Sequence, residues 1–143
     1  RSGNLLDYIE KTFGKEITIN QFWKVLCNTF GFIWSTNQKT IGCRGDVFVY
    51  SPLKKTQEVG SDLIPFHKLL HWLMYSLIEP FEMYGIKFSN KEIMLPLPEY
   101  RNGGLLVDIG LITLKDEDYY EKIHNVGSEL IVEWRALTLV LIG

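Results

Sequence analysis

The sequence has few of the features that mark secreted or membrane proteins. Its 143 residues contain only two cysteines, Cys27 and Cys43, without CxxC spacing, and no Asn-x-Ser/Thr sequon. One bridge would not make a secreted disulfide framework. The longest apolar run, residues 130–142, is too short to span a bilayer and contains two charged residues. We therefore expect a reduced protein of the cytoplasm, with the nucleus as the alternative, and no contact with a membrane.

An excess of positive charge is also missing. Lys and Arg number 15 against 17 Asp and Glu, which gives a net charge of −2. This balance argues against a broad nucleic-acid surface, although not against binding one small anion. Hydrophobic residues make up 46% of the chain and charged residues 22%, which is typical of a globular protein.

The length predicts a single domain over residues 1–143. The chain begins with Arg1 and ends at Gly143 within an apolar run. We therefore expect it to be a piece of a longer protein, with part of its core and of its site outside these residues.

Hydrophobic spacing predicts a mainly helical chain with a small β element. Thr18 suits an N-cap, Gly14 suits a helix end, and Gly31 ends or bends the helix that follows Thr18. Asp62 or Pro65 could open a helix that runs to about Glu79, where Pro80 kinks or ends it. The expected elements, in order, are a helix over 4–13, a helix from 19 to Gly31, a strand at 46–50, a helix ending at 79, an irregular stretch at 86–98, a turn at 102–104, and a helix over 129–142 with Ser128 as its cap.

The helix over 129–142 is the most informative segment. Apolar residues surround it almost completely, which predicts a central, buried helix. It nevertheless carries Glu133 and Arg135, which lie about 200° apart because they are two positions apart on a helix. Each needs its own partner, since an unpaired buried charge is costly. The two side chains either form structural ion pairs or line a pocket for a polar ligand.

The preceding long helix has a polar face with Lys68, His71 and Tyr75 at spacings of three and four. This face either contacts a ligand or is simply solvated. His67 and His71 have a spacing that can hold zinc, but no third histidine or cysteine accompanies them. We expect no metal site and no cofactor.

Residues 96–104 combine two prolines, Glu99, Arg101 and the pair Gly103-Gly104. Two glycines before a helix can offer N–H groups to a phosphate. No Walker-type Lys-Ser/Thr and no GxGxxG is present, so the nucleotide motif is weak. The alternative is an exposed loop with a turn.

These segments carry a resemblance to a known family. The runs Pro65-Phe66-His67-Lys68-Leu69, Tyr75-Ser76-Leu77-Ile78-Glu79-Pro80, Leu97-Pro98-Glu99-Tyr100-Arg101-Asn102-Gly103-Gly104-Leu105 and Val126-Gly127-Ser128-Glu129-Leu130 onward to Thr138 resemble the uracil-catabolism protein 4 family over about residues 42–142. The match corresponds to the C-terminal part of that family, which implies that the missing N-terminal part of the same protein is a partner of this domain. It implies a step in the breakdown of pyrimidine nucleotides through a ribosylurea-type intermediate.

A remoter similarity concerns Glu99-Tyr100-Arg101 followed by Glu133-x-Arg135. These runs and Lys68 are similar to the queuosine-nucleotide N-glycosylase family, a helical fold related to helix-hairpin-helix DNA glycosylases, where an aspartate replaces Glu99. The resemblance implies that the chain is the C-terminal part of a larger fold of this kind.

The two resemblances together imply an N-glycosyl hydrolase acting on a small nucleotide or ribosyl substrate. Cleavage of a ribosyl C–N bond passes through an oxocarbenium-like sugar, which carboxylates can stabilise or capture. Glu99 is the first candidate for this role, and Glu133 would hold sugar hydroxyls or orient a cation. Lys68, Arg101 and Arg135 would neutralise a 5′-phosphate.

Other assignments stay open at the level of sequence. Tyr75, His71 or Asp108 could protonate the leaving group. The domain could instead bind a metabolite or act as a scaffold without catalysing a reaction. Glu99, Arg101, Glu133 and Arg135 could also be structural ion pairs and nothing more.

Overall fold

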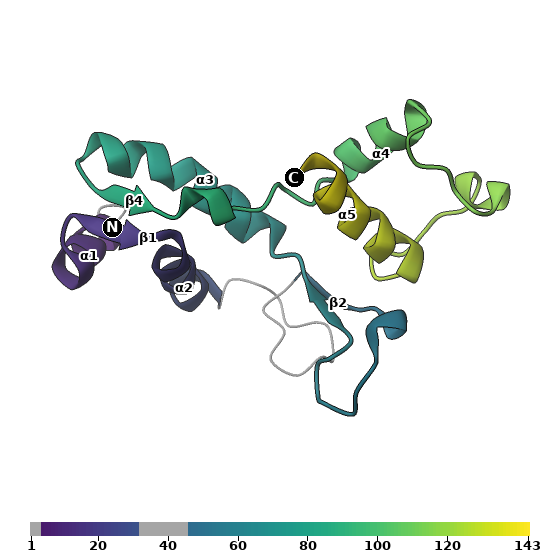
Figure 1. The fold of residues 1–143 in the computed structure, drawn as a ribbon, viewed down its shortest axis with the longest axis horizontal. Coiled ribbons are helices and arrows are strands. Elements are labelled where there is room, and N and C mark those ends of the chain that lie inside the picture. Colours follow the sequence, from purple (N-terminus) through teal and green to yellow (C-terminus); the bar gives the residue numbers. More distant parts are fainter. Residues whose placement is uncertain (1–3, 32–45) are drawn as a thin grey trace. The chain divides into compact units, whose positions relative to one another are not determined.

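The structure is a computed structural model and describes residues 4–31 and 46–143 (Figure 1). Its helices and strands, in chain order, are α1 (Asn4–Phe13), β1 (Glu16–Thr18), α2 (Ile19–Phe30), β2 (Val47–Val49), the 3-10 helix η2 (Ser51–Leu53), β3 (Leu63–Pro65), α3 (Lys68–Met83), β4 (Lys87–Ser89), η3 (Lys91–Ile93), α4 (Tyr100–Asp108), η4 (Glu117–Tyr120) and α5 (Glu129–Ile142). The described part is mainly helical with a small β component, as the sequence predicts.

The chain divides into two compact units. Unit 1 contains the described residues of 1–39 together with 69–95, and unit 2 contains the described residues of 40–68 together with 96–143. The prediction of one domain over 1–143 stays a prediction.

Unit 1 is built on helices α1 and α2, most of α3 and a two-stranded parallel ladder. The Thr18 hydroxyl accepts from the N–H of Gln21, and the Gln21 side chain accepts from the N–H of Thr18, so a complete capping box starts α2. Strand β1 pairs with β4 in parallel, with Ile17 opposite Phe88. The core of the unit is formed by Ile9, Ile17, Ile19, Phe22, Leu26, Leu70, Met74, Ile78, Phe81, Ile86 and Phe88.

Unit 2 joins an antiparallel ladder to two helices that contact each other, α4 and α5 (Figure 1). In the ladder, Phe48 of β2 lies opposite Ile64 of β3. The small core of the unit consists of Phe48, Phe66 and Val132. This packing brings β2, the end of β3 and the middle of α5 together.

The start of α3 differs from the prediction. Pro65 is the last residue of strand β3, and α3 begins at Lys68. His67, between the two, has a φ of 46°, a left-handed conformation that ends the strand and turns the chain into the helix. Pro80 lies inside α3, which continues to Met83. Because proline has no backbone N–H, the carbonyl group of Ser76, one turn earlier, lacks its helical hydrogen bond, and Ser76 is exposed to solvent.

The turn predicted at residues 102–104 is also wrong, because these residues belong to α4. A side chain on Gly103 would place its Cβ 1.7 Å from Nε1 of Trp134. Gly103 is therefore explained by the close approach of a neighbouring indole. The stretch 86–98, expected to be irregular, contains strand β4.

The last helix has the predicted bounds but not the predicted burial. Helix α5 runs from Glu129 to Ile142 after Ser128. Val140 is 76% exposed, and Leu141 and Ile142 are each more than 40% exposed. Only three of its residues, Val132, Arg135 and Thr138, are fully buried. Unit 2 therefore leaves part of the apolar surface of α5 exposed to solvent.

Candidate functional site

The most buried charge in the described part of the chain is Arg135 of α5, whose side chain is 1% exposed. Its Nη1 and Nη2 donate to Oδ1 and Oδ2 of Asp46 at 2.6 and 3.0 Å, and its Nε donates to the carbonyl oxygen of Pro98 at 3.2 Å. The fork of the guanidinium matches the two carboxylate oxygens. Arg135 thus forms a structural ion pair, as one of the two predictions from the sequence stated, but its partner, Asp46, was not among the predicted site residues.

Aromatic rings complete the surroundings of this guanidinium. Its carbon lies 4.1 Å from the ring centre of Phe66, 4.9 Å from that of Tyr100 and 5.9 Å from that of Phe48. Arginine stacks well on aromatic faces because the planar cation is attracted to the ring electrons. Arg135 is therefore held by hydrogen bonds in its plane and by rings on its faces.

Asp46 connects three parts of unit 2. Its Oδ2 also accepts from the backbone N–H of Lys68 at 2.8 Å, and its carbonyl oxygen accepts from the N–H of Phe66 at 3.0 Å. Since Lys68 is the first residue of α3, Asp46 acts as an N-cap supplied by a distant segment. Asp46 has a φ of 46°, which aspartate tolerates better than most residues.

The carboxyl group of Asp46 is kept ionised. Burial by itself would raise its pKa, but the hydrogen bond from Arg135, the one from the Lys68 N–H, and the charges of Arg135 and His67 together lower the pKa below its usual value of 3.8. The Asp46–Arg135 pair therefore carries both of its charges at neutral pH.

The second ion pair of the site joins Lys68 and Glu99. Nζ of Lys68 contacts Oε2 of Glu99, and their side chains are 23% and 27% exposed. Lys68 opens α3, and Glu99 is the residue before α4. The hydrogen bond and charge of Lys68, helped by the backbone N–H groups at the start of α4, lower the pKa of Glu99 against the effect of its burial. Glu99 is thus an ionised carboxylate that solvent can reach.

We call Asp46, Lys68, Glu99 and Arg135 the charged network. Its members come from the residue before β2, the start of α3, the start of α4 and the middle of α5. Tyr100 links its two ion pairs, because Nζ of Lys68 lies 5.9 Å from the same ring that Arg135 contacts. The structure therefore brings together three of the predicted site residues, Lys68, Glu99 and Arg135.

Glu133 lines a different feature. The structure has a pocket of about 260 Å³ on another face of α5, which we call the Glu133 pocket. It is lined by Ile112, Thr113, Leu114, Lys115, Tyr119, Glu129, Leu130, Glu133, Trp134 and Leu137. Glu99 and Arg135 are not among these residues. Glu133 and Arg135 lie on different faces of α5 because residues two positions apart on a helix are separated by about 200°.

The remaining predicted residues lie elsewhere. Arg101 is exposed on the first turn of α4. His71 and Tyr75 belong to unit 1, where the His71 ring lies 4.5 Å from the ring of Trp23 and the Tyr75 hydroxyl donates to the carbonyl oxygen of Leu95 at 2.8 Å. The roles predicted for these three residues stay predictions.

Within residues 4–31 and 46–143, no group of three or more His, Cys, Asp and Glu side chains could hold a metal ion. Cys43 lies outside these described residues. No helix of the described part is long and apolar enough to cross a membrane.

Sequence reasoning missed Asp46, although a signal was present. Asp46 directly precedes a β-branched, alternating run and follows a glycine, Gly45. A buried arginine on α5 requires an acidic partner, and Asp46 is the acidic residue that lies within the predicted strand over 46–50. The search for partners of Arg135 could therefore have reached it.

Comparison with known proteins places the chain in a family. A family model described as "Protein of unknown function (DUF1688)" matches residues 1–143. The chain belongs to this family. Two curated relatives are each 36% identical to it: Uracil catabolism protein 4 of Lachancea kluyveri, over 171 aligned residues, and Protein urg3 of Schizosaccharomyces pombe (strain 972 / ATCC 24843), over 148.

The alignments cover 99% of this chain but only 38% and 35% of the two relatives. The chain therefore spans little more than a third of their length. The resemblance to the uracil-catabolism protein 4 family is confirmed by these relatives. The similarity to queuosine-nucleotide N-glycosylases is not supported, and no solved structure matches the chain.

Proposed function

We propose that the chain is part of a protein of uracil catabolism and that it contributes to hydrolysis of the N-glycosidic bond of a ribosylurea-type nucleotide. The names of its relatives support the pathway. The observation that supports the chemistry is Glu99, an ionised and solvent-accessible carboxylate held by Lys68 at the start of α4.

In this proposal, water adds to the anomeric carbon while the bond from that carbon to nitrogen breaks. The products are a ribose, with its phosphate if the substrate carries one, and urea. Positive charge grows on the sugar as the bond breaks, and an ionised carboxylate stabilises it. The lowered pKa of Glu99 suits this electrostatic role or direct attack better than it suits a general acid, which must be protonated.

Other members of the charged network have supporting roles in the proposal. Lys68 keeps Glu99 ionised and oriented and offers its remaining N–H donors to substrate oxygens. Arg135 holds the start of α4 through the carbonyl of Pro98, which adjoins Glu99. Arg101, exposed near Glu99 on the first turn of α4, is the better placed of the two arginines for a phosphate.

A urea-release assay on the full-length protein tests the proposal. The substrate is ribosylurea 5′-phosphate, and the products are measured by mass spectrometry. We expect Glu99→Gln to abolish urea release while the fold is retained, and Glu92→Gln, an exposed glutamate of η3 in unit 1, to leave it unchanged. Turnover by Glu99→Gln close to that of the unchanged protein would remove Glu99 from the mechanism.

A binding or scaffold module is the second candidate. It is favoured by the charged network itself, since Arg135 and Lys68 already have protein partners. This candidate predicts that the unchanged full-length protein binds the substrate without releasing urea.

A further inference from the structure

Asp46 holds the backbone that carries Lys68. Three successive N–H groups donate to this one residue: those of Phe66 and His67 donate to its carbonyl oxygen at 3.0 and 3.4 Å, and that of Lys68 donates to Oδ2 at 2.8 Å. We call these contacts the backbone arm. Because Lys68 is the first residue of α3, the backbone arm fixes the point from which the lysine side chain extends.

The backbone conformation is unusual on both sides of this contact. Asp46 and His67 each have a φ of 46°, and within the described ranges only Asn90 among the other non-glycine residues has a positive φ. Such conformations are costly for residues with a side chain, and they persist where the surrounding contacts hold them. They also cluster at functional sites, because the chain accepts the cost in order to place particular groups.

A second set of contacts runs from Asp46 to both neighbours of Glu99, and we call it the arginine arm. The carboxylate of Asp46 accepts from Nη1 and Nη2 of Arg135 at 2.6 and 3.0 Å. In turn, Nε of Arg135 donates to the carbonyl oxygen of Pro98 at 3.2 Å, and its guanidinium carbon lies 4.9 Å from the ring centre of Tyr100. Since Pro98 precedes Glu99 and Tyr100 follows it, the guanidinium holds the chain on both sides of this carboxylate.

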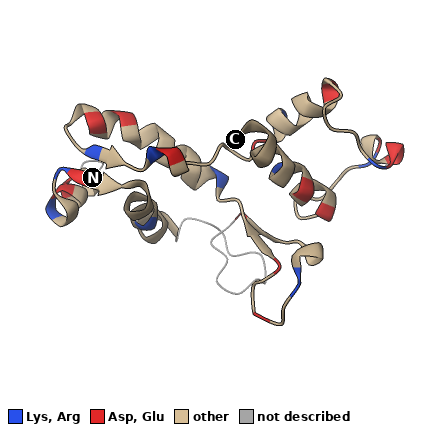
Figure 2. Cartoon of the chain, in the orientation of Figure 1, with Lys and Arg blue, Asp and Glu red and all other residues tan. Residues whose placement is uncertain are grey.

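The two arms close the charged network into a ring. Nζ of Lys68, held by the backbone arm, contacts Oε2 of Glu99, held by the arginine arm. Figure 2 shows basic residues at the start of α3 and on α5, the two helices that the arms connect. Asp46 belongs to both arms. Because Arg135 is only 1% exposed, water cannot readily replace the carboxylate if it is lost.

We propose that Asp46 is a positioning residue for Glu99, which sets the contact between Lys68 and Glu99 by holding the backbone of one and, through Arg135, both chain neighbours of the other. The consequence for catalysis rests on the proposed function, whereas the geometry does not. Asp46 acts through its neighbours and not on the substrate, because its two carboxylate oxygens already accept three hydrogen bonds from the protein.

Asp46→Asn breaks the ring at the shared residue. The amide has a single accepting oxygen, whereas the carboxylate uses two oxygens to accept its three hydrogen bonds. Whichever way the amide turns, its NH2 group faces an N–H donor of Arg135 or of Lys68. At least one arm must therefore open, and the contact between Lys68 and Glu99 is no longer fixed.

The first test follows the ionisation of Glu99 and needs no activity. The full-length protein is labelled with carbon-13 in its glutamate carboxyl groups, and the resonance of Glu99, identified by its loss in Glu99→Gln, is titrated across the acidic range. The hydrogen bond and charge of Lys68 lower the pKa of Glu99. We therefore expect this pKa to rise by about 1 in Asp46→Asn, because an opposite charge held nearby is released.

The second test is the rate of urea release by the full-length protein. We expect kcat to fall about tenfold or more in Asp46→Asn, since a small misplacement of a reacting group has effects of this size. KM should change by less than about threefold, because Asp46 does not contact the substrate. A residue with a purely structural role would lower the amount of folded protein and leave the pKa of Glu99 where it is.

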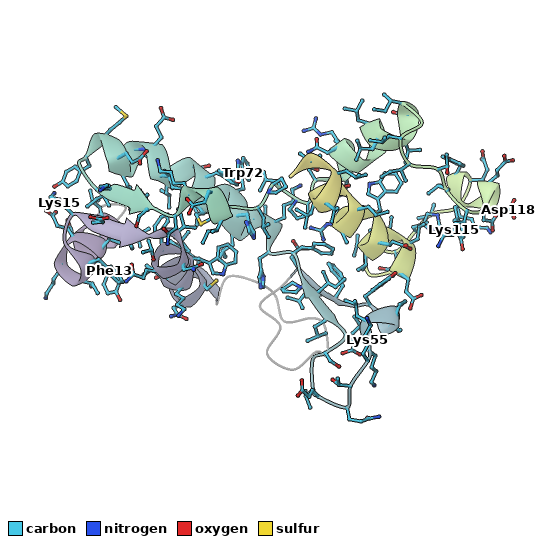
Figure 3. All side chains as sticks on the ribbon, viewed as in Figure 1. Phe13, Lys15, Lys55, Trp72, Lys115 and Asp118 are labelled. Carbon is cyan, nitrogen blue, oxygen red and sulfur yellow. The ribbon has the colours of Figure 1, made fainter. Side chains whose placement is uncertain are left out.

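Two controls separate positioning from loss of charge and from loss of stability. Asp118→Asn makes the same substitution in η4 of unit 2 (Figure 3), where the side chain is 78% exposed. Thr18→Ala removes the cap of α2 in unit 1 and lowers the melting temperature. Both should leave the pKa of Glu99 and kcat unchanged.

Arg135→Lys tests the arginine arm with the positive charge kept, and it applies even if Asp46→Asn does not fold. Lysine lacks the fork that matches the carboxylate and the Nε donor to Pro98. We expect the pKa of Glu99 to rise, but less than in Asp46→Asn, because the backbone arm remains. An unchanged pKa in either variant, a larger rise in Arg135→Lys than in Asp46→Asn, or an equal rise in Thr18→Ala would overturn the proposal.

The two tests also distinguish this proposal from the proposed hydrolysis. A raised pKa of Glu99 in Asp46→Asn, without any urea release by the unchanged protein, would reject the hydrolysis and support the positioning. Urea release by the unchanged protein, with the pKa of Glu99 unmoved in Asp46→Asn, would reject the positioning and leave the hydrolysis standing.

Discussion

Arg135 and Asp46 are 89 residues apart in the sequence, yet the guanidinium of one meets the carboxylate of the other through two hydrogen bonds of 2.6 and 3.0 Å. The same carboxylate accepts from the first N–H of α3. One aspartate therefore joins the start of a strand, the start of a helix and the middle of α5. Unit 2 has only a small apolar core, Phe48, Phe66 and Val132, so this polar connection is expected to matter for its stability.

Asp46→Asn should destabilise the protein by about 1–3 kcal/mol. Removing one charge of a largely buried pair leaves the other poorly compensated, and the 29% exposure of the Asp46 side chain keeps the cost below that of a fully buried pair. Asparagine also tolerates a positive φ, so the backbone is kept, while the substitution removes the charge and replaces one accepting oxygen with an NH2 group that cannot accept from Arg135 or from the Lys68 N–H. Urea denaturation followed by circular dichroism measures it.

The matched control is Asp108→Asn, at the exposed end of α4, which should change the free energy of unfolding by less than about 0.5 kcal/mol. Equal effects of the two substitutions would mean that the Asp46–Arg135 pair contributes nothing to the fold. The double variant Asp46→Asn with Arg135→Met should have a higher free energy of unfolding than Asp46→Asn alone, because the buried guanidinium that lost its partner charge is then removed.

Acid should weaken the fold through the same carboxylate. The pKa of Asp46 is lowered in the folded protein relative to its usual 3.8, so its contribution is fully present above the unfolded pKa and is lost as the pH falls through the folded pKa. We expect the free energy of unfolding to fall below about pH 4. The fall should be less steep in Asp46→Asn, and denaturation series between pH 2 and pH 7 on both proteins measure it. Parallel curves would contradict the assignment.

Local signals predicted α1, α2 and α5 and missed α4 and the contacts that connect distant segments. Such signals extend over only a few residues, as in the capping pair Thr18 and Gln21 and the helix-ending Gly14, whose φ is 74°. Helices α1, α2 and α5 accordingly have the predicted bounds or nearly so. Strands β1 and β4 are three residues long and pair across about 70 positions, which no local pattern reveals.

The candidate site shows the same limit. Lys68 and Glu99 stood out in the sequence and received their roles from the resemblance, and the structure joins them in an ion pair. Glu133 and Arg135 were recognised as charges that need partners, but spacing on one helix does not say which segment faces each of them. Asp46 supplies the partner of Arg135 from the other end of unit 2.

The two adjacent glycines of α4 should respond in opposite ways to alanine. A Cβ on Gly103 would lie 1.7 Å from Nε1 of Trp134, whereas a Cβ on Gly104 would lie 3.8 Å from Cζ2, an ordinary contact. Gly103→Ala should destabilise the protein by about 1–3 kcal/mol, because either the helix or the indole must move. Gly104→Ala should be neutral or stabilising by up to about 1 kcal/mol, because alanine favours helix.

Thermal unfolding of these two variants provides the measurement, and each serves as the control of the other. The fluorescence of Trp134 should change in Gly103→Ala alone, since only that substitution displaces the ring. A smaller effect of Gly103→Ala than of Gly104→Ala would show that the close approach of the two helices is wrong.

Lys68→Met should move the acidic limb of the pH profile for urea release to higher pH. The hydrogen bond and charge of Lys68 are the main reason that the pKa of Glu99 is lowered. If Glu99 acts as an ionised carboxylate, activity requires a pH above its pKa, so removing Lys68 leaves less of the active form at any acidic pH. The measurement is kcat/KM for urea release across the acidic range. Lys91→Met, which breaks the surface pair with Glu82 in unit 1, should leave the limb in place. A Lys68→Met protein that loses rate equally at every pH would assign Lys68 to substrate binding and leave the ionisation of Glu99 without a role in the rate.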